Sequence, residues 1–195
     1  MRPSDSAQYA DRRVLADIRS ASRVNDVVLI VAAAVFVGLL AQISIHLSFT
    51  PVPITGQTLG VLLSGSALGW RRGAAAMLLY AVAGVVGVPW FAAHSSGYAS
   101  ASFGYVLGFI LAAAVVGRLA ESSLGKTVAV TTVAMIAGEG VMYACGVTWL
   151  AVDLHVGISR AIALGLTPFL IGDAIKATMA ALLLPAAWRL VRRAP

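Results

Sequence analysis

The feature that most constrains this chain is a series of long apolar stretches separated by short loops that carry arginine and lysine. Apolar residues make up 59% of the sequence and charged residues only 11%, whereas a soluble globular domain carries about 25% charged residues. A chain of 195 residues cannot hide that much apolar surface in one core and still present a wetted exterior. Lipid is therefore the expected solvent for most of the chain.

Each of these stretches is close to the length that crosses about 30 Å of hydrocarbon. We expect an all-α membrane protein with six transmembrane helices, at 27–47, 55–69, 73–93, 103–119, 128–152 and 168–191. The second is short and contains polar residues such as Gln57 and Thr58, so its lipid-facing surface must be small. One membrane domain, 27–195, thus follows a polar cytoplasmic leader, 1–26, which lacks the apolar run of a cleavable signal peptide.

The basic residues predict how these spans are oriented. Of the 14 lysines and arginines, all except Arg160 and Lys176 lie before the first span, in the second or fourth connection, or at the end of the chain. Basic residues in short loops gather on the cytoplasmic side, so both termini are expected to be cytoplasmic. Without the second span, the loops that carry Arg71, Arg72 and Arg118 would fall on mixed sides, so the charge pattern supports it.

Asp173 and Lys176 are ionisable residues inside the last predicted span, and a spacing of three puts them on one face of a helix. If Thr167 is the N-cap and Pro168 the first helical residue, they lie about 8 and 12 Å below the outer end of that helix. A charge near the bilayer centre costs roughly 2.5–3.5 kcal/mol and therefore usually faces a partner or a cavity. The pair is either a salt bridge between helices or a ligand site, and the two roles are compatible.

Three weaker candidates lie elsewhere in the sequence. Glu139, between two glycines halfway along the fifth span, either marks close helix packing or contacts a ligand. The loop 89–105 is rich in glycine, serine and aromatic residues, which suit either headgroup anchors or close contact with a ligand. Ala34 and Gly38 are small residues four positions apart on the first span, and they form a smooth patch against which another helix can pack closely. That helix belongs either to this chain or to another protein.

Motifs for catalysis, metals or nucleotides are weak or missing. Leu124-Gly125-Lys126-Thr127 resembles the end of a phosphate loop, but Ala120 stands where that motif requires glycine. The 3 histidines have no cysteine or carboxylate at metal-ligand spacing, and Cys145 is the single cysteine. The basic residues are not clustered on one folded face. We therefore expect no enzyme, no cofactor, no metal site and no nucleic-acid partner.

Five blocks of the sequence, taken in order, resemble the BioY family, the biotin-binding S components of energy-coupling factor (ECF) transporters. They are PVPITGQTLG at 51–60, the segment 79–91 ending in PWF, FGYVLGF at 103–109, YACGVTWL at 143–150 and PFLIGDAIK at 168–176. Each block alone is weak, but the ordered set is specific. Members commonly have Gly-Pro-Thr-Gly-Gly-Tyr where this chain has SASFGY at 100–105, so loop contacts before Gly104 are less secure.

The resemblance implies a six-helix vitamin-binding subunit whose site opens to the outside. It also implies partners: a transmembrane coupling subunit with two cytoplasmic ATPases, docked on small residues of the first helix such as Ala34 and Gly38. The family's last helix holds biotin through an aspartate and a lysine, which correspond to Asp173 and Lys176. The further candidate residues for ligand binding are Gln57, Trp90, Phe91, Ser96, Gly97, Gly104 and Tyr105.

The expected function is therefore high-affinity biotin binding from the extracellular side, followed by ATP-driven uptake through an ECF module. Two alternatives stay open at this point. The chain could be an autonomous carrier that needs no ATPase subunits. It could also be an intramembrane enzyme with Glu139 or Asp173 as a base, although the missing motifs argue against that.

Overall fold

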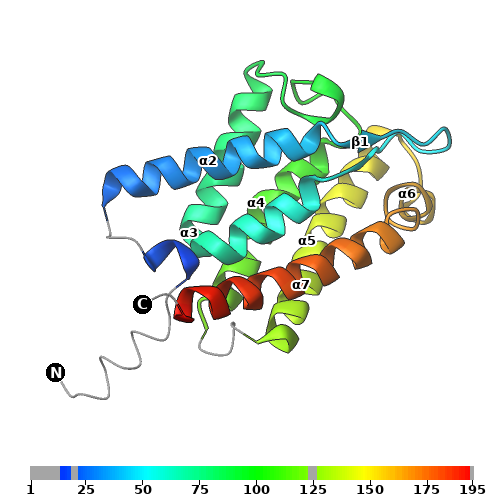
Figure 1. The fold of residues 1–195 in the computed structure, drawn as a ribbon. Coiled ribbons are helices and arrows are strands. Elements are labelled where there is room, and N and C mark those ends of the chain that lie inside the picture. Colours follow the sequence, from blue (N-terminus) through cyan, green and yellow to red (C-terminus); the bar gives the residue numbers. More distant parts are fainter. Residues whose placement is uncertain (1–13, 19–21, 123–126, 194–195) are drawn as a thin grey trace.

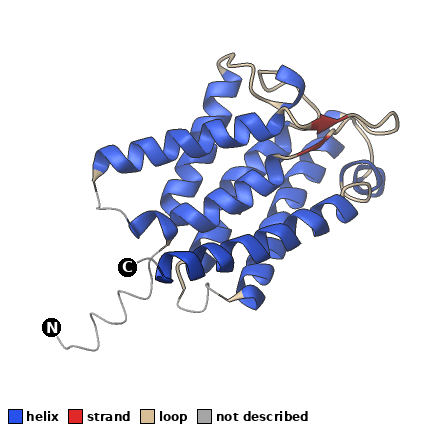
Figure 2. Cartoon of the chain, viewed as in Figure 1, coloured by secondary structure: helices blue, strands red, loops and turns tan. Residues whose placement is uncertain are grey.

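The structure is a computed structural model that describes residues 14–18, 22–122 and 127–193, so most of the predicted leader and the Leu124-Gly125-Lys126 segment lie outside the described residues. Helices dominate the described chain, and strands are limited to one short antiparallel pair (Figure 2). The elements in order are η1 (Leu15–Ile18), α2 (Arg23–Ala41), β1 (Ser44–Ile45), β2 (Ile54–Thr55), α3 (Gln57–Val85), η2 (Ala92–His94), α4 (Phe103–Ala120), α5 (Val128–Asp153), α6 (Ile158–Gly165) and α7 (Leu170–Arg193).

The helix α3 folds back on itself at Gly69, and its two halves correspond to the second and third predicted spans. It ends at Val85, eight residues before the predicted end of the third span at Ala93, because the chain turns at Gly87, where φ is +114°. Gly69 has φ +81° and ψ 174°, a backbone conformation that essentially only glycine adopts. Two contacts join residues before Gly69 to residues after it. The Gln57 side chain donates a hydrogen bond to the Tyr80 hydroxyl, and a Cβ atom at Gly73 would lie 3.0 Å from Gly65 Cα. These pairs are symmetric about Gly69, so the two halves of α3 form an antiparallel hairpin (Figure 1).

The remaining predicted spans correspond to single helices. α4 and α5 match the predicted 103–119 and 128–152 to within a residue, whereas α2 ends at Ala41 because the chain turns into β1 at Ser44. In the described part of the chain, α2, α4 and α5 are long and apolar enough to cross a membrane, and α6 with residues 170–186 of α7 forms a further pair bent by 56°. The two halves of α3 are shorter, so the count of six spans stays a prediction.

The bundle has two distinct ends (Figure 1). At one end lie η1, the turn at Gly69 and the junction between α4 and α5; the Trp70 backbone N–H donates to the Glu121 carboxylate there, at 3.1 Å. At the other end lie β1, β2, the loop around η2, and α6. The Thr50 hydroxyl ties the β1–β2 connection to α6 by donating to the Leu164 carbonyl, at 2.8 Å. The first turns of α3 and α7 also begin at this second end.

The smooth patch on α2 faces the inside of the bundle. Ala34 has no exposed surface, and a Cβ atom at Gly38 would lie 3.2 Å from the Trp90 ring. The two small residues expected to receive a coupling subunit are therefore packed against other residues of this chain. The outward side of α2 instead carries large apolar residues, among them Val28, Val35 and Leu39.

Candidate functional site

A cavity lies at the end of the bundle that contains β1, β2 and α6. The cavity is open at its mouth, and its empty volume is about 790 Å³ when the space at the mouth is counted. Its walls come from the β1–β2 region, from the η2 loop and from four helices. The lining residues are Val52, Pro53, Thr55, Gln57, Thr58, Phe91, Ala92, Ser95, Ser96, Gly97, Ser100, Ser102, Phe103, Tyr105, Val106, Phe109, Glu139, Met142, Tyr143, Phe169, Asp173 and Lys176.

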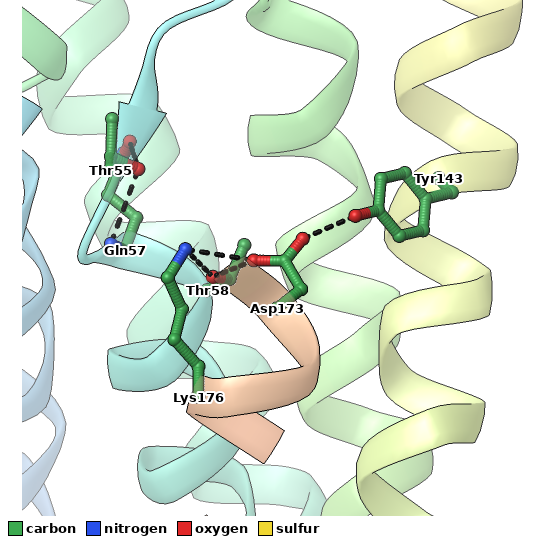
Figure 3. Close-up of polar contacts among 6 residues, drawn as sticks. All are labelled: Thr55, Gln57, Thr58, Tyr143, Asp173 and Lys176. Atoms are coloured by element: carbon green, nitrogen blue, oxygen red, sulfur yellow. Dashed lines mark hydrogen bonds and ion pairs between the residues drawn. The ribbon is translucent and has the colours of Figure 1, made fainter. Parts of the chain in front are cut away.

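The predicted acid–base pair lies in the wall of this cavity. The Lys176 ammonium contacts Asp173 Oδ1 at 2.8 Å, and the two side chains are only 17% and 7% exposed. Lys176 also donates to the Thr58 hydroxyl at 3.0 Å, and that hydroxyl lies 3.2 Å from Asp173 Oδ1 (Figure 3). The pair is thus a salt bridge and a cavity wall at once, as the two compatible interpretations allowed.

The second oxygen of Asp173 is also occupied. The Tyr143 hydroxyl, on α5, donates to Asp173 Oδ2 (Figure 3). One carboxylate therefore joins the start of α3, the middle of α5 and the start of α7. Both oxygens of a buried carboxylate need such partners, since an unpaired charge in a bundle is strongly unfavourable.

The first turn of α7 explains where the pair lies along the helix. α7 begins at Leu170, and the Asp173 backbone N–H bonds to the Phe169 carbonyl at 2.9 Å. Thr167 is not the N-cap that the sequence suggested, because its hydroxyl turns back to the Ile162 carbonyl of α6. Asp173 therefore lies in the first turn of the helix, where a negative charge is favourable, and nearer to the start of the helix than predicted.

Polar side chains of α3 form a second line of contacts behind the cavity wall. Gln57 is buried, accepts from the Thr55 hydroxyl at 2.9 Å and donates to Tyr80 at 2.7 Å. The Tyr80 hydroxyl in turn donates to the Trp90 carbonyl at 3.1 Å, and the Trp90 ring N–H returns to the Tyr80 carbonyl. Gln57 thus contacts the cavity, while Trp90 supports it from outside.

The loop that contains η2 closes one side of the cavity and is fixed by Gln42, at the end of α2. The Gln42 amide donates to the carbonyls of Trp90 and Phe91, at 3.1 and 3.3 Å, and accepts from the His94 backbone N–H at 3.1 Å. Ala93 and His94 both have positive φ, which is unfavourable for residues with a Cβ atom. Gln42 therefore holds a strained loop whose neighbours line the cavity.

Seven of the predicted ligand-binding residues line the cavity, and two do not. Those that line it are Gln57, Phe91, Ser96, Gly97, Tyr105, Asp173 and Lys176. Gly104 instead lets α4 approach α5, because a Cβ atom there would overlap the Trp149 side chain. Trp90 packs on Tyr80, with ring centroids 5.1 Å apart. The two residues support the wall and do not face the cavity.

Sequence reasoning missed two residues that complete the site. Tyr143 and Thr58 bond directly to the acid–base pair, but they lie 30 and 115 positions from Asp173 along the chain. The sequence did contain a signal for each, because both belong to blocks that carry the family resemblance. No spacing rule could have selected them, since their contacts depend on how the helices are rotated in the bundle.

The arrangement is suited to binding. It offers acceptors and a cation beside aromatic walls, the combination that fixes the orientation of a small polar–apolar ligand. Among the described residues, no group of three or more histidine, cysteine, aspartate or glutamate side chains could hold a metal ion. The fold and the site together define a membrane-embedded small-molecule binding protein.

Comparison with known proteins identifies the family. The BioY family model matches residues 12–193, so the chain belongs to the BioY family. The biotin transporter BioY of Rhizobium etli is 42% identical over 165 residues, which cover 80% of this chain and 87% of that protein. The biotin transporter BioY of Thermotoga maritima is 38% identical over 160 residues, or 79% of this chain and 92% of that one.

A solved structure shares the fold. The crystal structure of the S-component for biotin from an ECF-type ABC transporter superposes with a TM-score of 0.74 over 90% of this chain and 96% of that chain, at 20% identity. Together with the apolar helices, the family identifies a multi-pass membrane protein. The relatives are named as transporters and not as enzymes.

Proposed function

We propose that this chain is the biotin-binding subunit of an ECF-type vitamin transporter and that it captures biotin from outside the cell. The observation that carries the proposal is the buried Asp173–Lys176 pair in the wall of an open cavity. A charge pair in the membrane is costly to maintain and is typical of substrate sites. The names of the relatives supply the ligand.

The cavity is chemically suited to biotin. The ureido ring of biotin has two N–H donors and a carbonyl, its thiophane ring is apolar, and its valerate ends in a carboxylate. Lys176 offers a donor for a carbonyl or a carboxylate, and carboxylate side chains offer acceptors for N–H groups. The rings of Phe91, Phe103 and Phe169 give the apolar ring of the ligand a dry surface.

Capture from outside follows from the charge pattern and the position of the cavity. Arg71 and Arg72 directly follow the Gly69 turn, and Arg118 is in the last turn of α4, so all three belong to the end of the bundle away from the cavity. If that basic end faces the cytoplasm, both termini are cytoplasmic and the mouth of the cavity opens to the exterior. Cysteine-accessibility labelling at Gly157, in the α5–α6 turn, and at Ser122, after α4, tests this orientation, and reaction of Ser122→Cys from outside would contradict it.

Delivery into the cell is assigned to partners. The sequence has no complete phosphate-binding loop, so we propose that ATP hydrolysis is supplied by the coupling subunit and ATPases of an ECF module. Vesicles that contain this chain alone should bind biotin without accumulating it. Accumulation without any partner would instead support an autonomous carrier.

Isothermal titration calorimetry on the purified chain is the direct test of the ligand. Biotin should bind with one site per chain, while vitamins that lack the ureido ring, such as thiamine and riboflavin, should not compete. An absence of heat with biotin, for a chain shown to be folded, would reject the proposed function.

A further inference from the structure

Glu139 is a second carboxyl group in the cavity, on a different helix from Asp173. It lies on α5 one turn before Tyr143, so the two residues share a helix face, and both line the cavity. Gly138 beside it packs against Val116 and Leu62, which fixes this turn of α5 in the bundle. The carboxyl group of Glu139 is therefore held in the cavity wall by well-packed neighbours.

The hydrogen bonds of the two carboxyl groups differ sharply. Asp173 has partners on both oxygens: Lys176 and Thr58 on Oδ1, and Tyr143 on Oδ2. Glu139 Oε1 is buried and has no hydrogen-bond partner among the described residues. A buried acceptor without a donor is unfavourable by the full desolvation of that group, so it is rare unless something else supplies the donor.

We propose that Glu139 accepts an N–H group of the ligand, beside the Asp173–Lys176 pair. This inference rests on the proposed function, in which the ligand is biotin and its ureido ring carries the N–H donors. Glu139 lines the cavity, and its Oε1 is a buried acceptor that no described protein group satisfies, whereas each oxygen of Asp173 already has a partner. The bound ligand thus supplies the hydrogen-bond donor that the Glu139 carboxyl group on α5 lacks in the empty protein.

This role has two consequences of opposite sign. Removing the carboxyl group takes away an unsatisfied buried acceptor, so the empty protein should become more stable. The same change removes the ligand's partner, so binding should weaken. A residue that only supports the fold would not separate these two effects, because its loss would lower both.

The experiment compares Glu139→Gln and Glu139→Met with the wild-type chain. Gln keeps the size and removes the charge, and Met keeps the length without any acceptor. We expect Glu139→Met, which removes the acceptor, to melt at a higher temperature than the wild type without ligand and to bind biotin about 10- to 100-fold more weakly, as for a hydrogen bond to a charged group. Glu139→Gln keeps a neutral acceptor, so its loss of affinity should be smaller. Asp153→Asn is the matched control, because Asp153 is an exposed carboxylate at the end of the same helix; its affinity should not change.

Biotin methyl ester shows which end of the ligand Glu139 meets. If Glu139 accepts from the ureido ring, Glu139→Gln weakens biotin and its methyl ester by the same factor. If Glu139 instead lies beside the valerate carboxylate, the substitution strengthens biotin and leaves the ester unchanged, which would overturn the inference. Unchanged biotin affinity in both variants would also overturn it. A wild-type chain that does not bind biotin would reject the proposed function itself.

Discussion

The two ends of the bundle use charged residues in opposite ways. At the cavity end, Asp173 is buried and Lys176 is largely buried, and the pair has partners on two other helices, Thr58 of α3 and Tyr143 of α5. At the basic end, Arg72 lies at the periphery, where it contacts Asp17 of η1 at 2.6 Å and Asp26 of α2 at 2.8 Å. The first set of charges is shielded from water and open to a cavity, and the second is partly solvated.

This difference separates a cavity end, where charges are placed for ligand binding, from a basic end, where Arg72 joins α3 to η1 and α2. Buried charges interact strongly because the local dielectric constant is low, so small changes there should alter affinity. Partly solvated ion pairs contribute little each, so changes at the basic end should alter stability slightly and affinity not at all. The following predictions test this separation, from the largest expected effect to the smallest.

Asp173→Asn should weaken biotin binding most. The substitution leaves Lys176 without the counter-ion that fixes its position in the cavity wall, so we expect about 100-fold weaker binding, or about 2.7 kcal/mol. Calorimetry on the folded variant measures the effect. Asp17→Asn makes the same chemical change at the basic end and should keep wild-type affinity. Equal losses in the two variants would contradict the separation of the two ends.

Gly69→Ala should destabilise the basic end without changing the cavity. Its backbone conformation is essentially restricted to glycine, and a Cβ atom there would lie 2.6 Å from the Glu121 carboxylate. We expect a loss of about 2–3 kcal/mol in unfolding free energy, read as a lower melting temperature. Gly87→Ala is the matched control, since Gly87 also has positive φ but a Cβ atom there would meet no other atom within 4 Å. Gly87→Ala should lower the unfolding free energy by less than Gly69→Ala. An equal loss in the two variants would show that the contact with Glu121 is unimportant.

Gln42→Ala should loosen the loop around η2 and weaken binding through that loop. The alanine variant loses the bonds to Trp90, Phe91 and His94 that hold two strained residues in place. We expect about tenfold weaker biotin binding, or about 1.4 kcal/mol, together with faster amide exchange in 91–97. Faster exchange at the Gly69 turn instead would mean that the effect is a general loss of stability.

Arg72→Gln should have the smallest effect. The side chain of Arg72 is 21% exposed, and its partners Asp17 and Asp26 are more exposed still. Partly solvated pairs of this kind contribute at most about 1 kcal/mol each, so the melting temperature should fall by a few degrees and the fall should shrink at high salt. Biotin affinity should not change. A large loss of affinity would mean that the N-terminal end of α2 is coupled to the cavity.

Much of the fold could be predicted because it depends on local pattern. Apolar length and the positions of arginine and lysine located α4 and α5 to within a residue and required a reversal between the second and third spans. The turn at Gly69 fulfils that requirement. The ends of α2 and α3 and the start of α7 were less accurate, because β1, the loop after α3 and the bend between α6 and α7 depend on contacts between distant residues, such as Thr50 with Leu164 and Gln42 with Trp90.

The sequence by itself determined the class of protein, the order of its helices and the placement of Asp173 and Lys176 on one helix face, because all of these follow from composition or from a helical spacing of three. Tertiary structure decided which side chains share the cavity. It brought Tyr143 to Asp173, turned Ala34 inward and left Glu139 Oε1 without a partner among the described residues. A helix has the same periodicity whatever its rotation against its neighbours, and that rotation is set by close packing of residues far apart in the chain.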